Sequence, residues 1–129
     1  MGRYIHKSPD VIRKELGIPE ADFRQCLAEY ALGIFKLRKR DIKLKIVEGK
    51  RSKGRVVSLL LMTHKQTGTT YCAGTILNRN RLSKTELRKI VKSKVDQSMA
   101  TLETNITNQL RMNVIRRGFW TQRRKRNEN

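Results

Sequence analysis

Residues 82–87, which read Leu-Ser-Lys-Thr-Glu-Leu, carry the clearest local structural signal in the chain. Ser83 and Glu86 have the spacing of a capping box, in which each side chain binds a backbone N–H group at the start of a helix. Leu82 and Leu87 bracket this box in the way that a hydrophobic staple does. The pattern therefore predicts that a helix begins here.

The helix that begins at residue 83 should be long. Apolar residues recur at steps of four with one step of three, and neither glycine nor proline occurs before residue 118. We predict a helix over residues 83–117 and a basic tail over residues 118–129. A three-stranded sheet is too short to cover such a helix. Its distal half, residues 99–115, is therefore expected to break near the polar residues 104–108, project into solvent, or pack on another copy or a partner.

Three segments before this helix have the character of β-strands. In the first, at residues 41–47, apolar residues alternate with Lys43 and Lys45, which predicts a half-exposed strand. Residues 55–63 are apolar on both faces, as expected of the middle strand of a sheet, and residues 69–77 are rich in threonine, tyrosine and isoleucine. Short loops separate the segments, so we predict a three-stranded antiparallel sheet.

Two helices are predicted before the strands. Ser8 is a suitable cap for a short helix over residues 9–16, and Gly17 follows its end. A second helix is predicted over residues 19–38, where apolar residues recur at helical spacing and the final basic run favours the negative end of the helix dipole. The fold class is therefore α+β, with a helix, a three-stranded antiparallel sheet, a long C-terminal helix and a basic tail. Residues 1–117 are expected to form a single domain.

The charge of the chain indicates its partner. Its 129 residues include 30 Lys and Arg but only 11 Asp and Glu, which gives a net charge of +19. Residues 36–55, 79–94 and 111–126 together contain 24 of the 30 basic residues. Such a clustered excess is typical of proteins that bind a polyanion and release its counterions. We therefore predict that the partner is nucleic acid.

The predicted binding residues form three groups. The first lies on the first strand and on the glycine-containing segment 48–54, where flexible cations are expected in a loop. The second surrounds the start of the long helix, whose free N–H groups favour an anion. The third lies at the end of this helix and in the tail, where the only tryptophan stands among arginines and is suited to stacking on a base. The residues are Lys43, Lys45, Lys50, Arg51, Lys53 and Arg55; Arg79, Arg81, Lys84, Arg88 and Lys92; and Arg116, Arg117, Trp120, Arg123, Arg124, Lys125 and Arg126.

Each group has a structural alternative. The first is also compatible with a solvated surface loop, and the second with the ordinary polar face of a helix. In the third, Phe119 and Trp120 have an alternative role in closing the last helix against the core.

The cysteines and histidines do not indicate a metal or a cofactor. Cys26 and Cys72 lie 46 residues apart in apolar runs, with only His6 and His64 as companions. This spacing fits neither a disulfide framework nor a zinc site, so two buried, reduced thiols are expected.

No segment reaches the ~18 consecutive apolar residues of a membrane span, and the first ten residues lack the apolar core of a signal peptide. We expect an intracellular protein, in the cytoplasm or, in a eukaryote, the nucleus, and no membrane partner.

One short motif resembles part of an enzyme site. Glu48 and Lys50 form an E-x-K at the end of a strand, which is similar to the metal-binding half of the PD-(D/E)-x-K nucleases. In that family a further Asp lies on an adjacent strand. Here Asp10 precedes a whole predicted helix, and Asp41 lies seven residues upstream on the same strand. A metal-dependent nuclease is therefore kept as a minor alternative, and the chain is expected not to be an enzyme.

The order of the predicted elements resembles that of double-stranded-RNA-binding domains and is similar to that of the Alu-binding subunits of the signal recognition particle. The resemblance covers residues 19–101. Its best local match is Leu82-Ser83-Lys84-Thr85, which is similar to the Ser-Lys start of the second helix in the RNA-binding domains. Thr85 and Glu86 stand where that family has basic and small residues. The resemblance implies contacts to A-form RNA through phosphates and 2′-hydroxyls rather than base edges.

These observations favour a small basic protein that binds RNA rather than DNA through backbone phosphates, as a structural or packaging component of a nucleoprotein assembly. The first alternative is a DNA-binding accessory or regulatory protein that forms a dimer through the distal half of the long helix. Adhesion to an acidic protein or an anionic membrane is a further alternative, because it uses the same charge.

Overall fold

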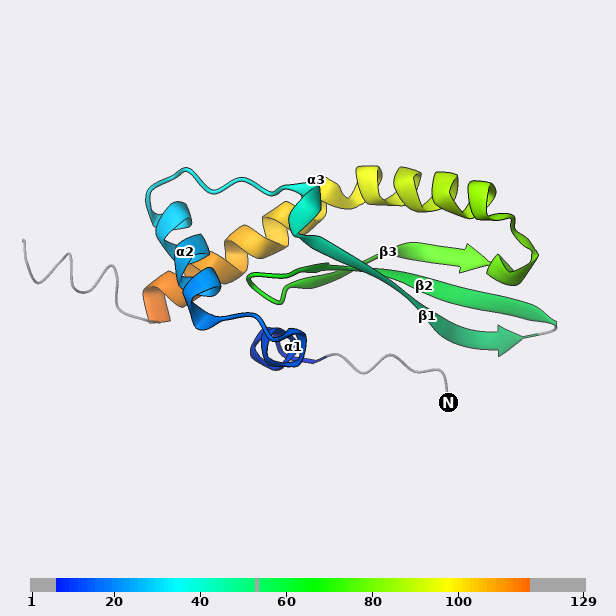
Figure 1. The fold of residues 1–129 in the computed structure, drawn as a ribbon, viewed down its shortest axis with the longest axis horizontal. Coiled ribbons are helices and arrows are strands. Elements are labelled where there is room, and N and C mark those ends of the chain that lie inside the picture. The colour runs from blue at the N-terminus through cyan, green and yellow to red at the C-terminus, as the bar shows by residue number, and fades with distance from the viewer. Residues whose placement is uncertain (1–6, 53, 117–129) are drawn as a thin grey trace, which may run out of the picture.

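The computed structural model describes residues 7–52 and 54–116, and the side chains of residues 50–52 lie outside this description. The elements follow the expected order and confirm the α+β fold class with a long C-terminal helix (Figure 1). They are α1 (Pro9–Leu16), α2 (Glu20–Ala31), η1 (Lys39–Asp41), β1 (Ile42–Ser52), β2 (Arg55–His64), β3 (Thr70–Leu77), η2 (Arg79–Arg81) and α3 (Lys84–Arg116). Residue 117 and the predicted tail at 118–129 lie outside the described residues.

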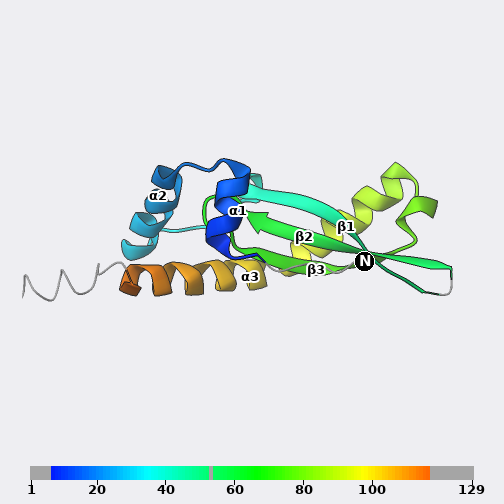
Figure 2. The same cartoon turned by 90° about the horizontal axis from the view of Figure 1, so that it is seen from below.

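The three strands form one antiparallel sheet in the order β1-β2-β3, so β2 is the middle strand as predicted. One face of the sheet packs against α3 through Leu60, Met62 and Ile76, which are buried. The opposite face carries Lys43 and Lys45, and α1 lies against one end of it (Figure 2). A layer of helix thus covers one face, and the other is only partly covered.

The second helix is shorter than predicted. It ends at Ala31 rather than at residue 38, because Gly33 adopts a left-handed conformation with φ 75°. The N–H of Gly33 bonds the carbonyl of Tyr30, and the N–H of Ile34 bonds the carbonyl of Glu29, which together form a Schellman cap. The basic run at residues 36–40 therefore lies outside the helix and does not interact with its dipole.

The first strand is longer than predicted, because residues 48–52 continue β1 instead of forming a loop. The register shifts between Glu48 and Arg51, which marks a bulge. A Cβ at Gly49 would lie 2.8 Å from the carbonyl oxygen of Val57, so glycine permits a close approach of β2 at this point. At Gly49 the glycine signal that suggested a loop thus reflects a bulge.

The start of α3 confirms the capping box. The N–H of Ser83 donates to Glu86 Oε1 at 3.1 Å, and the N–H of Glu86 donates to Ser83 Oγ at 3.1 Å. The helix then continues to Arg116 without the break expected near residues 104–108. Thr104 and Thr107 instead bond their hydroxyls to carbonyl oxygens of the same helix, at 3.0 Å each.

The distal half of α3 is covered by the chain itself. Its apolar residues Leu102, Ile106, Leu110 and Val114 are fully buried in one cluster with Phe23 and Leu27 of α2. Figure 1 shows α2 beside this half of the helix. The three predicted alternatives, a break, projection into solvent or packing on another copy or a partner, rest on the sheet as the one cover of α3, and α2 provides the additional cover. The buried row removes the reason for expecting self-association through this half.

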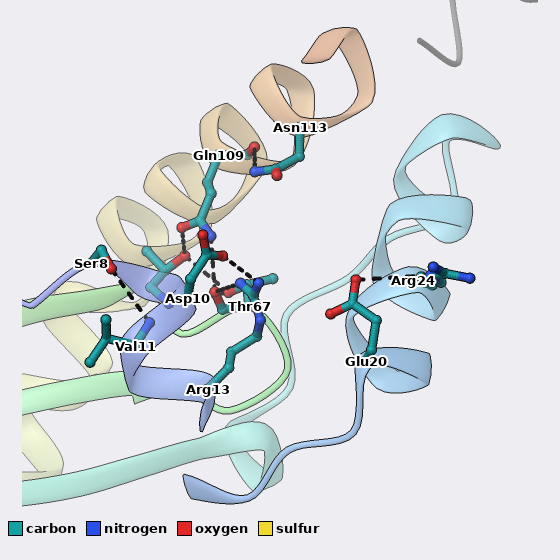
Figure 3. A network of polar contacts seen from close by, with 10 residues as sticks. Ser8, Asp10, Val11, Arg13, Glu20, Arg24, Thr67, Gln109 and Asn113 are labelled. Atoms are coloured by element: carbon teal, nitrogen blue, oxygen red, sulfur yellow. Dashed lines mark hydrogen bonds and ion pairs between the residues drawn. The ribbon is translucent and has the colours of Figure 1, made fainter. Parts of the chain in front are cut away.

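A buried polar network fixes α1 and the distal half of α3 on the turn between β2 and β3 (Figure 3). The Arg13 guanidinium donates to the carbonyl of Thr67 at 2.9 Å, and Gln109 Nε2 donates to the same oxygen at 2.9 Å. Arg13 also pairs with Asp10 and lies 3.8 Å from the ring centroid of Phe23. Three elements that are distant in sequence therefore share one anchor.

His64 lies in the same region, buried against Thr67 and Phe35. Burial disfavours the charged imidazole and lowers the pKa of His64 from 6.5 to about 4, although the nearby Asp41 carboxylate acts in the opposite direction. Between these pH values the unfolded chain binds a proton at His64 that the folded chain does not bind. The stability that the neutral His64 provides is present above pH 6.5 and is lost as the pH falls toward the folded-state pKa.

Acidification from pH 6.5 to 4 is expected to lower the free energy of unfolding by roughly 2–3 kcal/mol through His64. Urea unfolding of the unmodified protein and of His64→Asn across this range measures the effect, because the amide does not titrate. Carboxylates titrate in both proteins, so their contribution cancels in the difference. Parallel pH profiles would show that His64 is not held in its neutral form.

The two cysteines differ from each other. Cys26 is buried as expected, and burial raises the pKa of its thiol to about 12. Cys72 is exposed on the edge strand β3, so the expectation of a second buried thiol is wrong. Among the described residues, no helix combines the length and the apolar character needed to cross a bilayer.

Candidate nucleic-acid interface

Arg55 of the first predicted group and the residues of the second group that precede α3 lie at one end of the molecule. The β1–β2 hairpin and the start of α3 lie at this end, on the right in Figure 1. The N–H of Val56 donates to Asn78 Oδ1 at 3.0 Å, and the N–H of Asn78 donates to the carbonyl of Val56 at 2.7 Å. These two bonds join the start of β2 to the segment that leads into η2, and Arg55 and Arg79 flank them.

Asn78 makes this connection possible through its backbone as well as its side chain. It has φ 48° and ψ 49°, the left-handed conformation that asparagine tolerates better than most residues. The chain can therefore turn sharply after β3 and enter η2. We call the residues gathered by this turn, Arg55, Arg79, Arg81 and Lys84, the basic end.

The charges of the basic end are not neutralised by the described part of the chain. All four side chains are exposed. The ion pairs among described side chains involve Lys7, Arg13, Arg24 and Lys39 instead. Cations that are exposed and have no acid partner are available to phosphates without first breaking an internal contact.

The N-terminus of α3 itself is occupied by an acid of the chain. The Glu86 carboxylate accepts a hydrogen bond from the N–H of Ser83, and this bond, with the hydroxyl of Ser83, lowers the pKa of Glu86 below its ordinary value. A phosphate at this place would compete with a carboxylate. The side chains of the basic end, rather than the free N–H groups of the helix, are therefore the stronger attraction for an anion.

A row of cations extends from the basic end along α3. Lys84, Arg88 and Lys92 recur every four residues, and all three are exposed. The row spans about 12 Å, because an α-helix rises ~1.5 Å per residue. It provides a line of positive charge beside the apolar residues that face the sheet.

Lys43 and Lys45 do not join the basic end. They border a cavity of about 160 Å³ together with Thr63 and Thr70, on the face of the sheet opposite α3. Arg51 lies six positions beyond Lys45 along β1, which corresponds to roughly 20 Å at ~3.3 Å per residue. The first predicted group therefore does not form one surface, because Lys43 and Lys45 lie away from Arg55.

Lys7 borders the same cavity and was not among the predicted site residues. Its ammonium lies 2.8 Å from a carboxylate oxygen of Glu15 on α1. Only the docking of α1 brings Lys7 near the sheet, and no periodicity in the sequence indicates this docking.

For several predicted site residues, the side chain or the whole residue lies outside the part of the chain that the structure describes. The backbone of Lys50 and Arg51 belongs to β1, with Arg51 opposite Val56, but their side chains are not described. Arg116 is exposed at the last position of α3, about 48 Å along the helix from Lys84. Lys53, Arg117, Trp120, Arg123, Arg124, Lys125 and Arg126 are outside the described residues, as is Phe119.

The carboxylates of the nuclease interpretation are far apart. Asp41 ends η1 and Glu48 lies seven positions further along, in β1, which corresponds to about 23 Å at ~3.3 Å per residue. Asp10 pairs with Arg13 on α1. Within residues 7–52 and 54–116, His, Cys, Asp and Glu side chains do not gather in a group of three that could hold a metal ion. Asp41 and Glu48 therefore cannot bind one metal ion together.

Comparison with protein-family models, curated proteins and solved structures gave no match to the chain. The function must therefore be inferred from the charge and the geometry of the chain itself.

Proposed function

We propose that this protein binds structured RNA through backbone phosphates, with the basic end as the main contact, and that it acts as a structural or packaging component of a nucleoprotein assembly. One observation carries the proposal. The bonds between Val56 and Asn78 hold the backbone of Arg55 near that of Arg79, with Arg81 two residues further along the chain, and none of these arginines forms an ion pair with a described acid.

Contacts of this kind suit phosphates better than bases. Arginine matches the geometry of a phosphate through two parallel N–H groups, and its charge is permanent. Such contacts fix the position of a nucleic acid but carry no sequence information. A protein that uses them is expected to bind many sequences alike, which is what packaging requires.

The row of Lys84, Arg88 and Lys92 extends this surface along α3. A helix that presents cations beside a sheet resembles the arrangement by which double-stranded-RNA-binding domains follow A-form shape. This resemblance in the arrangement of helix and sheet favours RNA over DNA.

A competition experiment tests the proposal. A fluorescent RNA duplex is bound to the protein, and unlabelled RNA and DNA duplexes of the same sequence compete for it at roughly physiological salt. RNA is expected to compete better, because removal of the 2′-hydroxyls changes the A-form shape and removes contacts. Equal competition by DNA would favour the DNA-binding alternative.

The salt dependence of the same complex gives a second measure. The logarithm of the association constant is expected to fall linearly with the logarithm of the salt concentration, with a slope of about one per phosphate contact. An affinity that does not change with salt would contradict binding through phosphates.

A further inference from the structure

An apolar groove lies between α3 and the edge strand β1. Its volume is about 360 Å³, and its floor consists of Leu44 from β1 and of Leu87, Val91 and Val95 from the proximal half of α3. All four are aliphatic.

Leu87, Val91 and Val95 belong to the same row of apolar side chains on α3 that is buried in its distal half. There Leu102 and Ile106 are completely buried. In the proximal half Leu87 and Val91 are only partly buried, and Leu44 opposite them is 43% exposed. The row is therefore covered by α2 at one end of the molecule and left open over β1 at the other. An exposed aliphatic surface next to a buried one is a place where a further segment can pack.

The rim of the groove carries an excess of positive charge. Lys39, Arg88 and Lys92 border it, with Asp96 as the one acid among its lining residues. Lys39 and Asp96 pair at 2.5 Å, and the hydrogen bond from Lys39 lowers the pKa of Asp96 below its ordinary value. Neither Arg88 nor Lys92 forms an ion pair with a described acid, although the charge of Lys92 also helps to lower the pKa of Asp96.

The floor and the rim together indicate the chemistry of the occupant. Four aliphatic side chains offer neither an aromatic surface for stacking nor polar atoms for reading base edges, so a nucleic acid would bind only at the rim. A protein segment with aliphatic side chains along one side would fill the floor, and carboxylates beside them would meet Arg88 and Lys92.

We propose that this groove is the docking site for an acidic amphipathic segment of a partner protein. Two or three aliphatic side chains of that segment fill the floor of Leu44, Leu87, Val91 and Val95, and its carboxylates pair with Arg88 and Lys92. The floor spans eight residues of α3, or about 12 Å, which matches roughly two turns of a docked helix.

This interface goes beyond the proposed RNA contact and does not depend on it. The two share Arg88 and Lys92, so a bound acidic segment would cover cations that otherwise face phosphates. A partner of this kind would displace RNA from the row along α3 while leaving Arg55, Arg79 and Arg81 free.

Methyl NMR of the full chain tests the proposal. The probe is a synthetic amphipathic peptide with leucines at helical spacing and glutamates at the flanking positions. We expect it to shift the methyl resonances of Leu44, Leu87, Val91 and Val95. Two matched peptides, one with serines in place of the leucines and one with lysines in place of the glutamates, are expected to leave these resonances unchanged.

Leu44→Thr combined with Val91→Thr keeps the β-branched shape at residue 91 but places hydroxyl groups on the floor. This double variant is expected to weaken binding of the acidic peptide about tenfold, which corresponds to 1.4 kcal/mol. Leu77→Thr is the matched control, because Leu77 is exposed on the other face of the sheet and should not affect the peptide.

Four results would overturn the proposal. The first is no shift with the acidic peptide, and the second is an equal shift with the serine peptide, which would reduce the interaction to charge alone. The third is an equal shift of the floor methyls by an RNA hairpin without peptide, which would make nucleic acid the occupant. The fourth is a shift of the floor methyls with protein concentration, accompanied by a dimer in sedimentation, which would make a second copy the occupant.

Discussion

Replacing Leu110 by alanine is expected to destabilise the protein by about 2–5 kcal/mol. Leu110 is fully buried in the distal half of α3, in the cluster that contains Phe23 and Leu27 of α2. Truncation removes apolar contacts and leaves a cavity that helix and sheet can close only in part. Urea unfolding followed by circular dichroism measures the change in the free energy of unfolding.

Met112→Ala is the matched control, because Met112 lies two residues further along the same helix and is 51% exposed. Its effect is expected to stay within about 0.5 kcal/mol, as is usual for surface positions. Equal effects of the two substitutions would mean that the distal half of α3 does not pack on α2 within one chain. A partner or a second copy would then again be needed to cover it.

The parts of the fold that depend on local sequence could be predicted. The capping box of Ser83 and Glu86 lies within four residues, and its two hydrogen bonds are those that the pattern requires. The middle position of β2 likewise followed from a segment that is apolar on both faces. Both signals are carried by residues that are close together in the sequence.

The course of the distal half of α3 could not be predicted, because it depends on packing between distant segments. Thr104 and Thr107 have low helix propensity, which suggested a break. Burial of Leu102 and Ile106 against α2 outweighs these preferences, since each buried aliphatic side chain contributes about 1.5–3 kcal/mol and each propensity difference less than about 1 kcal/mol. The sequence does not show that α2 lies beside this half of the helix.

The end of α2 shows the opposite case, in which a local signal ends the helix although the apolar spacing continues beyond it. Gly33 stands at the position where a Schellman cap needs a left-handed residue. The continuing apolar spacing of Ile34 and Leu37 favoured a longer helix. In the structure Ile34 is 64% exposed, and Leu37 is buried from an extended segment, where its N–H bonds Glu103.

The candidate site was predictable in its residue types but not in its arrangement. The excess of arginine and lysine is visible in the composition. That Arg55 approaches Arg79 follows from the bonds between Val56 and Asn78, which join residues 22 positions apart. That Lys43 and Lys45 lie elsewhere follows from their distance along the hairpin, because Lys45 pairs with Leu61, six strand positions away from Arg55.

Neutralising the three arginines of the basic end is expected to weaken RNA binding by roughly 100-fold or more, because each charge-assisted contact to phosphate is worth about 1.5–3 kcal/mol. The variant carries Arg55→Gln, Arg79→Gln and Arg81→Gln, all at exposed positions, so little effect on folding is expected. The slope of affinity against salt should fall by about one for each phosphate that the variant no longer binds. Fluorescence anisotropy with a labelled RNA duplex at several salt concentrations measures both quantities.

A second triple variant separates the position of the charges from their number. Lys14→Gln, Lys36→Gln and Arg111→Gln remove the same charge from exposed positions on α1, on the segment after α2 and on the distal half of α3. These elements lie toward the end of the molecule opposite the hairpin (Figure 1). If phosphates bind at the basic end, this control keeps most of its affinity, because distant exposed charges are screened within about 10 Å at moderate salt. Equal reductions in affinity for the two variants would mean that RNA responds to net charge alone, and the bonds between Val56 and Asn78 would then have no part in forming the site.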